Sequence, residues 1–465
     1  MTSSDQPREG SLDAPVRHPL AWREPDFTDP GALDAETRRV FDICHGCRRC
    51  FNLCDTFPRL FDLIDNSETG ELDSVASAGF GPVVDACTLC DMCFMTKCPY
   101  VPPHEFALDF PHLMLRHRAA EAAAGKTGLA DRELAKTDRN GKLGSAVAPL
   151  ANWATGTGNR LARKGLEWTA GIDHRAPLPA YAKRTMEKRW AKDAAPVDRA
   201  APAAGRRAVI YATCHMNYSD PDLGLLCQRL LAANGVETEL VYPECCGMPQ
   251  LEQGALARVA DKAVAVAAAM RPWIDQGYQV IALVPSCALM LKMEWPLLVP
   301  EGVPGHEDVV ALSAATRDVS QVLVDIAKTE GLATQPGPID GPQGGHVSLH
   351  MACHARAQNM GRKAEELLAL IPGLTLDVIE RCSGHGGAWG VKKGNFDTAM
   401  KIGRPVVRAA AKTPSAYVVS ECPLAAQHIH HGLAEQAAAE KTKTSHDRDL
   451  RHPLEIFARA CGLGA

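Results

Sequence analysis

Features that define several large classes of protein are missing from this 465-residue chain. It has no run of 18 or more uncharged apolar residues, so no membrane-spanning helix is expected. Its opening residues lack the apolar stretch of a secretion signal, so we expect a cytoplasmic protein. The formal charge of −5 includes no strongly basic domain, which argues against a nucleic-acid binder.

A dinucleotide-binding fingerprint is missing as well. The segment 155–159 is glycine-rich, but no strand precedes it and its third glycine is absent. Without a flavin or nicotinamide fingerprint, the organic chemistry is expected to belong to a cofactor on another subunit. Cysteine, in contrast, is abundant. The chain has 17 cysteines, and eight of them lie between positions 44 and 98.

These eight cysteines form two runs of similar spacing. The first run, C-x2-C-x2-C-x3-C, consists of Cys44, Cys47, Cys50 and Cys54. The second run, C-x2-C-x2-C-x4-C-P, consists of Cys87, Cys90, Cys93 and Cys98. A doubled run is the pattern of a ferredoxin with two [4Fe–4S] clusters, in which the fourth cysteine of each run ligates the other cluster. The pattern therefore predicts one cluster on Cys44, Cys47, Cys50 and Cys98. It predicts the other on Cys87, Cys90, Cys93 and Cys54.

Zinc and disulfides are the alternatives for these runs. Structural zinc sites usually use two C-x2-C pairs, whereas this region has two triplets. Disulfides need an oxidising compartment, which the cytoplasmic prediction excludes. Apolar residues at helical spacing follow the first run (Phe57, Leu60, Phe61 and Ile64), so we expect an all-helical ferredoxin domain.

Composition and periodicity divide the chain into five segments. An extended lead-in (1–34) precedes the helical ferredoxin domain (35–118), whose first helix is expected to be capped by Asp34. A helical, basic connector covers 119–205. Beyond it the pattern becomes α/β, with one cysteine-rich domain at 206–335 and a second, degenerate one at 336–465.

The end of the connector is the most basic part of the chain. Residues 181–207 contain eight Lys or Arg against three Asp or Glu. A helix lying on the inner face of the cytoplasmic membrane or on a partner has this composition, and so does an ordinary solvated linker. Both interpretations stay open from sequence.

The two α/β segments repeat each other. In each, apolar strands are followed closely by cysteines, and equivalent cysteines are separated by 139, 137 and 135 residues (214 to 353, 245 to 382, 287 to 422). This near-constant offset indicates an internal duplication. Ligands of open α/β sheets bind beyond the carboxyl ends of the strands, which is where these cysteines are expected.

The first repeat offers four thiols for a third cluster: Cys214, Cys245, Cys246 and Cys287. The second offers a weaker, degenerate set: Cys353, Cys382 and Cys422. It has Ser383 where the first has Cys246, and His354 or His385 would complete a Cys3His zinc site. Buried core cysteines are the alternative for both sets. Cys227 and Cys461 are interpreted as structural or incidental.

The cysteine-rich stretches of this chain resemble a known family. The matching segments are 43–54, 87–99, 242–249, 284–296, 353–361 and 384–396. They are similar to the iron–sulfur subunit of anaerobic glycerol-3-phosphate dehydrogenase, to heterodisulfide reductase-related proteins and to subunits of glycolate and lactate oxidation systems. In that family each complete CCG motif ends in C-x2-C. Here Met290 and Ala425 stand at the last position, so the complete motif is not present.

Together these features predict an iron–sulfur electron-transfer subunit. It would take electrons from a flavoprotein partner and pass them through two [4Fe–4S] clusters toward a quinone or another acceptor. The alternatives are a thiol or disulfide reductase with a catalytic cluster in the first CCG domain, and a redox-sensing scaffold. Arg48, Arg49 and Lys97 lie beside cluster ligands, where they either tune the reduction potential or are ordinary solvated side chains.

Overall fold

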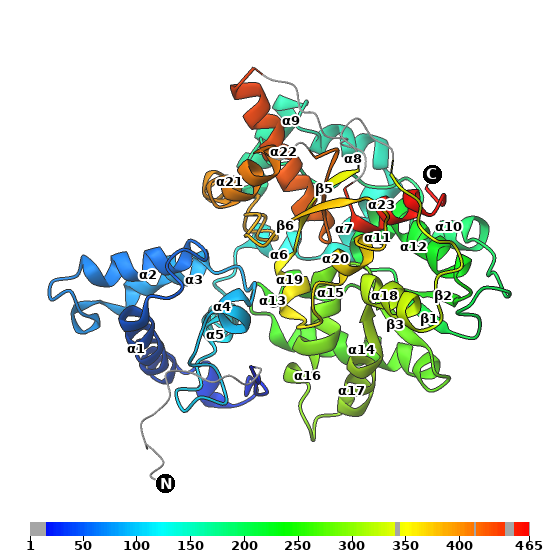
Figure 1. Ribbon diagram of the computed structural model, residues 1–465. Helices are drawn as coiled ribbons and strands as arrows, with labels where there is room; N and C mark the ends of the chain where they lie inside the picture. Colours follow the sequence, from blue (N-terminus) through cyan, green and yellow to red (C-terminus); the bar gives the residue numbers. More distant parts are fainter. Residues whose placement is uncertain (1–14, 340–344, 413–414, 442–450, 465) are drawn as a thin grey trace, which may run out of the picture. The chain divides into compact units, whose positions relative to one another are not determined.

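The computed structural model (Figure 1) describes residues 15–339, 345–412, 415–441 and 451–464. Residues 1–14 of the predicted lead-in (1–34) therefore lie outside the described residues. The chain divides into two compact units. The first contains residues 1–127 with 251–256, and the second contains residues 128–250 with 257–465.

The first unit is built from helices, and its described residues contain no strand. Its elements are η1 (Pro25–Phe27), α1 (Pro30–Cys47), α2 (Thr56–Asp65), η2 (Leu72–Ser74), η3 (Ser77–Phe80), α3 (Gly81–Ala86), α4 (Met92–Thr96) and α5 (Phe110–Ala123). Helix α2 buries all four residues that the sequence placed on an apolar helical face. The region is helical, and its assignment as a ferredoxin domain remains a prediction.

The start of α1 differs from the prediction. The helix begins at Pro30, upstream of the expected cap Asp34, because the side chain of Asp29 accepts a hydrogen bond from the backbone nitrogen of Ala32. Proline at the first helical position suits this start, since its fixed φ is helical and its missing N–H is not needed there. The polar lead-in is therefore shorter than the sequence indicated.

Phenylalanine side chains form the core of this unit. The ring of Phe57 lies 4.8 Å from that of Phe110, and Phe41 lies 5.2 Å from Phe80, edge to face. These rings come from α1, α2, η3 and α5 and are buried. Aromatic packing thus joins the helices on either side of the two cysteine runs.

The second unit opens with the helices of the connector. These are α6 (Leu129–Leu134), α7 (Thr137–Ala146), α8 (Ala148–Thr155), α9 (Arg160–Ala170) and α10 (Met186–Asp193). The basic stretch 181–207 includes α10, which packs against α12. Met186 is fully buried, and Arg189 forms ion pairs with Asp193 and Asp222. This stretch is therefore attached to the first α/β repeat.

The first repeat is an open, four-stranded parallel sheet in the order β2-β1-β3-β4. Its strands are β1 (Arg207–Tyr211), β2 (Glu237–Val241), β3 (Gln279–Ala282) and β4 (Thr316–Asp318). The helical elements along this part of the chain are α11 (Cys214–Tyr218), α12 (Pro221–Ala233), α13 (Met248–Leu251), α14 (Leu256–Ile274), α15 (Pro285–Leu289), the π-helical η4 (Met290–Glu294), α16 (Trp295–Leu298), α17 (His306–Ala315) and α18 (Val319–Thr329). The sequence did not predict β4, which is only three residues long.

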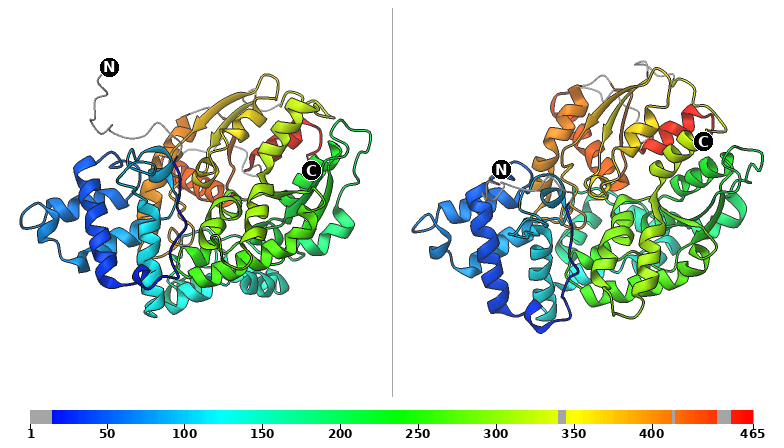
Figure 2. Two further views of the ribbon diagram at one scale, coloured as in Figure 1. Left: turned by 90° about the horizontal axis from the view of Figure 1, so that it is seen from below. Right: turned by 60° about the horizontal axis from the view of Figure 1, so that its bottom comes forward.

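The second repeat has a three-stranded parallel sheet in the order β6-β5-β7. Its elements are β5 (His346–His350), α19 (Cys353–Ala357), α20 (Lys363–Leu368), β6 (Thr375–Ile379), α21 (Phe396–Lys412), β7 (Tyr417–Ser420), α22 (Pro423–Ala439) and α23 (Pro453–Ala460). Figure 2 shows this repeat, in yellow and orange, beside the first, in green.

The two sheets match element by element. Strands that start at 207, 237 and 279 correspond to strands that start at 346, 375 and 417, offsets of 139, 138 and 138 residues. The order β2-β1-β3 also equals β6-β5-β7. The central strands β1 and β5 are buried along most of their length, as expected for parallel strands covered on both faces. The internal duplication predicted from the cysteine offsets is present in the fold.

Candidate functional site

The two cysteine runs lie at the ends of short helices in the first unit. Cys44 and Cys47 occupy the last turn of α1, and the rest of the first run lies in the loop before α2. Cys87 follows α3, Cys93 lies in α4, and Cys98 comes just after α4. All eight cysteines are free thiols, so none is consumed by a disulfide.

The electrostatics of the thiols show which of them are neighbours. Burial raises the pKa of Cys44, and the next largest contributions come from Cys98, then Cys50 and Cys47. Cys98 belongs to the second run, so the fold brings the fourth cysteine of that run to the first triplet.

The converse holds for the fourth cysteine of the first run. Burial raises the pKa of Cys87 to about 11, and Cys54 is among the charges that add to the shift. Burial also raises the pKa of Cys93, with smaller contributions from Cys90, Cys87, Cys50 and Cys54. The crossed ligand assignment itself remains a prediction.

The chemistry of this donor set fits an iron–sulfur cluster better than a single ion. No group of three or more Cys, His, Asp or Glu side chains in the described part of the chain has an arrangement that could hold a metal ion. A single zinc ion needs ligands that converge to about 2.3 Å from one point. A [4Fe–4S] cluster takes its cysteines on separate iron atoms, so the thiols need not converge on one point.

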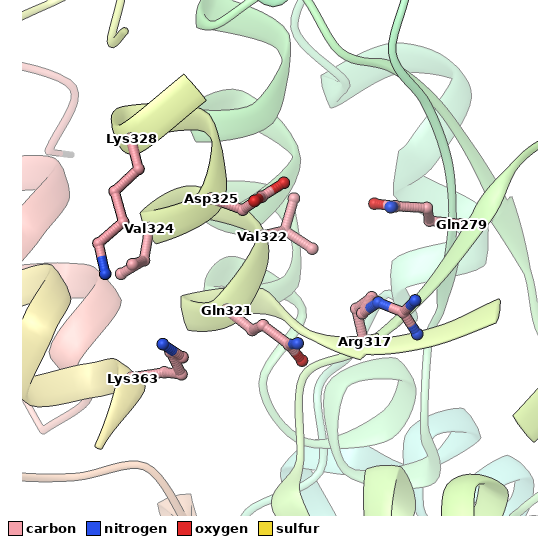
Figure 3. A pocket seen from close by; sticks show the side chains of 8 residues that line it. All are labelled: Gln279, Arg317, Gln321, Val322, Val324, Asp325, Lys328 and Lys363. Atoms are coloured by element: carbon pink, nitrogen blue, oxygen red, sulfur yellow. The ribbon is translucent and has the colours of Figure 1, made fainter. Parts of the chain in front are cut away.

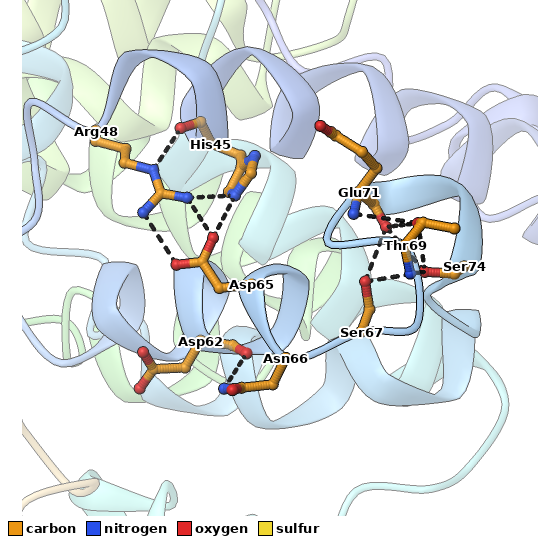
Figure 4. A network of polar contacts seen from close by, with 9 residues as sticks. All are labelled: His45, Arg48, Asp62, Asp65, Asn66, Ser67, Thr69, Glu71 and Ser74. Atoms are coloured by element: carbon orange, nitrogen blue, oxygen red, sulfur yellow. Dashed lines mark hydrogen bonds and ion pairs between the residues drawn. The ribbon is translucent and has the colours of Figure 1, made fainter.

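Arg48, a candidate for tuning a cluster, makes contacts of a different kind. It adopts a left-handed conformation (φ 53°) at the end of α1, and its Nε donates to the carbonyl of His45. Its guanidinium pairs with Asp65 on α2 (Figure 4). Hydrogen bonds from Arg48 and then His45 lower the pKa of Asp65 to about 2. Arg48 therefore joins the end of α1 to α2.

An arginine that the sequence did not single out supports the second run. Arg17 forms ion pairs with Asp91 at 2.6 Å and with Asp109 at 2.9 Å, and its guanidinium lies over the ring of Phe94. Asp91 lies inside the run with a positive φ of 62°. Although burial opposes it, the charges of His112 and Arg17 lower the pKa of Asp109. No spacing rule links position 17 to position 91, so only the fold reveals this contact.

The first α/β repeat gathers its four thiols beyond the carboxyl ends of β1, β2 and β3. The sulfur of Cys245 lies 3.7 Å from that of Cys214, and the sulfur of Cys246 lies 3.3 Å from that of Cys287. Parallel strands end at the same edge of a sheet, which brings these loops together. The four cysteines therefore form two close pairs, and that they hold a ligand together remains a prediction.

Three contacts hold the Cys245–Cys246 pair in place. The carboxylate of Asp138, on α7, accepts hydrogen bonds from the backbone nitrogen of Cys245 (3.0 Å) and from the hydroxyl of Tyr242 (2.5 Å). The indole of Trp295 donates to the carbonyl of Cys246 (3.1 Å). The neighbouring thiols of Cys214 and then Cys246 lower the pKa of Cys245. No sequence pattern points to Asp138, because its partners are about a hundred positions away.

The second repeat places its three cysteines at the equivalent strand ends. Cys353 begins α19, Cys382 follows β6, and Cys422 caps α22. Burial raises the pKa of Cys422, and Cys287 of the first repeat is among the charges that add to this shift. The cysteine loops of the two repeats therefore face each other.

Histidines collect beside the cysteines of the second repeat. Burial lowers the pKa of His385 to about 3, and His428, His215 and His354 add to the shift. The ring of His428 lies 6.3 Å from that of His385. The imidazole of His385 is therefore neutral at pH 7. In the described residues these side chains do not form a group that could hold a metal ion, so the suggested Cys3His zinc site stays a prediction only.

A cavity of about 330 Å³ lies elsewhere in this unit, beside β4 and α18 (Figure 3). Its lining is mostly polar and contains no cysteine: Gln279, Arg317, Gln321, Val322, Val324, Asp325, Lys328 and Lys363. Both lysines form ion pairs with Glu366, and Asp325 pairs with Arg206. The charges of this cavity are largely satisfied within the protein.

Comparison with known proteins agrees with this architecture. The cysteine-rich CCG domain family matches twice, at residues 208–292 and 347–429. The chain is 30% identical over 331 residues to the C subunit of anaerobic glycerol-3-phosphate dehydrogenase from Escherichia coli, which covers 70% of this chain and 76% of that protein. It is 24% identical to the D subunit of dihydromethanophenazine:CoB–CoM heterodisulfide reductase from Methanosarcina barkeri (55% of this chain, 59% of that protein).

A third relative is an iron-sulfur protein of Methanocaldococcus jannaschii, 24% identical over 54% of this chain and 46% of that protein. The predicted resemblance and the pair of CCG domains are therefore confirmed. As for membranes, none of the helices in the described residues is long and apolar enough to cross one.

Proposed function

Because the chain belongs to the family that includes the C subunit of anaerobic glycerol-3-phosphate dehydrogenase, we propose that it is the iron–sulfur electron-transfer subunit of a dehydrogenase complex. In this proposal the chain accepts electrons from a flavoprotein partner and passes them toward a quinone or another acceptor. Its own residues provide no flavin or nicotinamide fingerprint, so the oxidation of the organic substrate belongs to the partner.

The doubled cysteine run, whose eight thiols are all free, is the observation that carries the proposal. One [4Fe–4S] cluster would be held by Cys44, Cys47, Cys50 and Cys98. The other would be held by Cys87, Cys90, Cys93 and Cys54. Bound clusters of this type supply one-electron carriers whose potentials depend on charge and solvent exposure. A further cluster or a zinc ion in the CCG region completes the proposal.

The residues around the two cysteine runs suit a bound iron–sulfur cluster. Cys87 and Cys93 are buried, which keeps water from the ligands. Burial raises their pKa, so the free thiols are protonated at pH 7 and cluster binding releases protons. Arg17 holds the loop of the second run through Asp91 and Asp109, which fixes where these thiols point.

Iron and sulfide analysis with EPR of anaerobically purified protein tests the proposal. We expect about eight irons per chain, or about twelve if the first CCG site also holds a cluster. Cys98→Ser and Cys54→Ser should each perturb one cluster signal. Cys227→Ser is the matched control, because Cys227 is a fully buried cysteine in α12, outside both runs. Zinc without sulfide would overturn the proposal.

The two close thiol pairs of the first CCG site, Cys214–Cys245 and Cys246–Cys287, favour a second function, thiol or disulfide reduction. A thiolate is the nucleophile in thiol–disulfide exchange, and here it lies among three more thiols. Reducing one disulfide to two thiols takes two electrons and two protons, and the electrons would come from the same relay.

Oxidation of the reduced protein by added disulfides tests this alternative. If it holds, Cys245→Ser abolishes the disulfide-dependent oxidation, whereas Cys382→Ser in the second repeat has little effect. Equal, slow oxidation of both variants and the native protein would exclude it and leave electron transfer alone.

A further inference from the structure

Helices α7, α8 and α9 expose an unusual number of large apolar side chains. Among the described residues, twelve large hydrophobic side chains are exposed, and six of them lie within 143–168. They are Leu143, Val147, Leu150, Trp153, Leu161 and Trp168, which we call the 143–168 surface. Their exposed fractions run from 52% to 88%. Single exposed hydrophobic residues are normal, but a group of this size indicates an interaction site.

The spacing of these residues places them on helix faces. Leu143 lies on α7, Val147 lies at the break between α7 and α8, and Leu150 and Trp153 lie three residues apart on α8. On α9, Leu161 and Trp168 lie seven residues apart, two turns along one face. Helices α8 and α9 pack against each other, so their exposed residues belong to neighbouring helices.

The charges around this surface have one sign. The exposed charged residues of the three helices are all basic: Arg139, Lys142, Arg160 and Lys164. Arg139 forms an ion pair with Glu133 on α6, so Lys142, Arg160 and Lys164 make up the basic rim. The two acidic residues of these helices face other groups of the protein. Asp138 accepts hydrogen bonds from Tyr242 and Cys245, and Glu167 forms ion pairs with His174 and Lys393. The surface is thus apolar with a basic rim.

We propose that the 143–168 surface binds the face of a membrane that contains anionic lipid, with its apolar residues in the interfacial region. Tryptophan is enriched at the level of the lipid headgroups, and Trp153 and Trp168 are 63% and 88% exposed. Lysine and arginine beside an apolar helix face add attraction to anionic headgroups. A protein partner would be expected to present acidic side chains to the three cations of the rim, and it is the alternative that the experiment distinguishes.

The position of this surface differs from the basic stretch 181–207, which is packed onto the first repeat. The inner side of α7 also carries Asp138, which holds the loop of Cys245. The membrane-binding face and the first CCG site are therefore joined by a single helix. The inference goes beyond the electron-transfer role, because lipid binding requires neither a cluster nor a redox partner.

Vesicle sedimentation of the full-length protein tests the proposal. We expect binding to vesicles with phosphatidylglycerol and much weaker binding to phosphatidylcholine alone. The variant Leu161→Gln/Trp168→Gln should weaken binding at least about tenfold, because it removes apolar area from the interface. The variant Arg160→Gln/Lys164→Gln should weaken binding to anionic vesicles about thirtyfold, from about 1 kcal/mol per basic residue.

The matched control is Val310→Gln/Leu370→Gln, which changes two exposed apolar residues outside this surface and should bind like the native protein. Brominated lipid should also quench native tryptophan fluorescence. The proposal is overturned if the native protein binds neither vesicle, or if the control loses as much binding as the α9 variant. It is also overturned if the native protein ignores lipid and Leu161→Gln/Trp168→Gln converts an oligomer to a monomer, which would assign the surface to contact between copies.

Discussion

The two CCG repeats share a strand order but differ in what they place at the strand ends. In the first, four thiols lie together, and the strand β1 ends in Tyr211. In the second, one of the thiols is replaced by Ser383, and the equivalent strand β5 ends in His350. Duplication preserved the scaffold, while the residues beyond the strands diverged from a thiol cluster toward histidine and carboxyl groups.

This divergence has a thermodynamic consequence. In the second repeat, burial raises the pKa of Glu421 to about 8 and lowers the pKa of His350 to about 4. At the matching strand ends the first repeat has Leu283 and Tyr211, which do not titrate between pH 4 and 8. We therefore expect the second repeat to be the pH-sensitive half of the pair.

Glycine substitutions should produce the largest difference between the repeats. Gly247 and Gly384 both follow cysteine-containing loops and have similar φ values, +84° and +79°. A Cβ at Gly384 would overlap the backbone carbonyl of Ala399, whereas at Gly247 the nearest atom is a Val259 methyl at 3.4 Å. Gly384→Ala should lower the free energy of unfolding by more than about 4 kcal/mol, and Gly247→Ala by about 1–2 kcal/mol. Chemical denaturation of both variants checks this, and equal losses would contradict it.

Glu421→Gln should make the second repeat less sensitive to alkaline pH. Burial raises the pKa of Glu421 to about 8, with Asp318 adding to the shift, and its Oε1 has no hydrogen-bond partner in the described residues. The contribution of the neutral carboxyl is fully present below pH 4.5 and is lost as the pH rises through 8. The variant should gain on the order of 4 kcal/mol relative to the native protein across this interval. A difference that does not change with pH would show that Glu421 is not buried as a neutral acid.

His350→Gln should act in the opposite direction, at acid pH. Burial lowers the pKa of His350 to about 4, and its ring contacts the hydroxyl of Ser420 and the carbonyl of Arg381. The neutral ring stabilises the fold above pH 6.5, and this stability is lost as the pH falls to 4. The native protein should lose about 3 kcal/mol more than the variant over this range. Unfolding measured at several pH values checks it, and parallel curves would argue against it.

Trp295→Phe should have the smallest effect and concern the first repeat alone. It removes the hydrogen bond from the buried indole to the carbonyl of Cys246 and leaves that carbonyl without this donor. We expect a loss of about 1–2 kcal/mol and faster alkylation of Cys246. Trp273→Phe is the control, since Trp273 contacts Tyr278 and lies outside the cysteine loops. If Cys246 is alkylated at the same rate in both variants, the indole of Trp295 does not hold the loop of Cys246.

Much of this protein followed from local signals in the sequence. The spacing of the two runs predicts the ligand pattern, because a doubled run of closely spaced cysteines is the pattern of a two-cluster ferredoxin. The offset of about 138 residues revealed the duplication, because both repeats place a cysteine where a parallel strand ends. The strands themselves were readable as short apolar runs, since parallel strands are buried on both faces.

The features that only the tertiary structure decided depend on contacts between residues that are far apart in the sequence. Arg17 reaches Asp91 across 74 residues, and Asp138 reaches Cys245 across 107. No periodicity encodes such pairs, because they depend on how helices pack after they form. For the same reason, the sequence indicated the basic stretch 181–207 as the candidate for surface binding. Composition reports charge, but only packing decides which apolar residues stay exposed, and here packing left those of 143–168 uncovered.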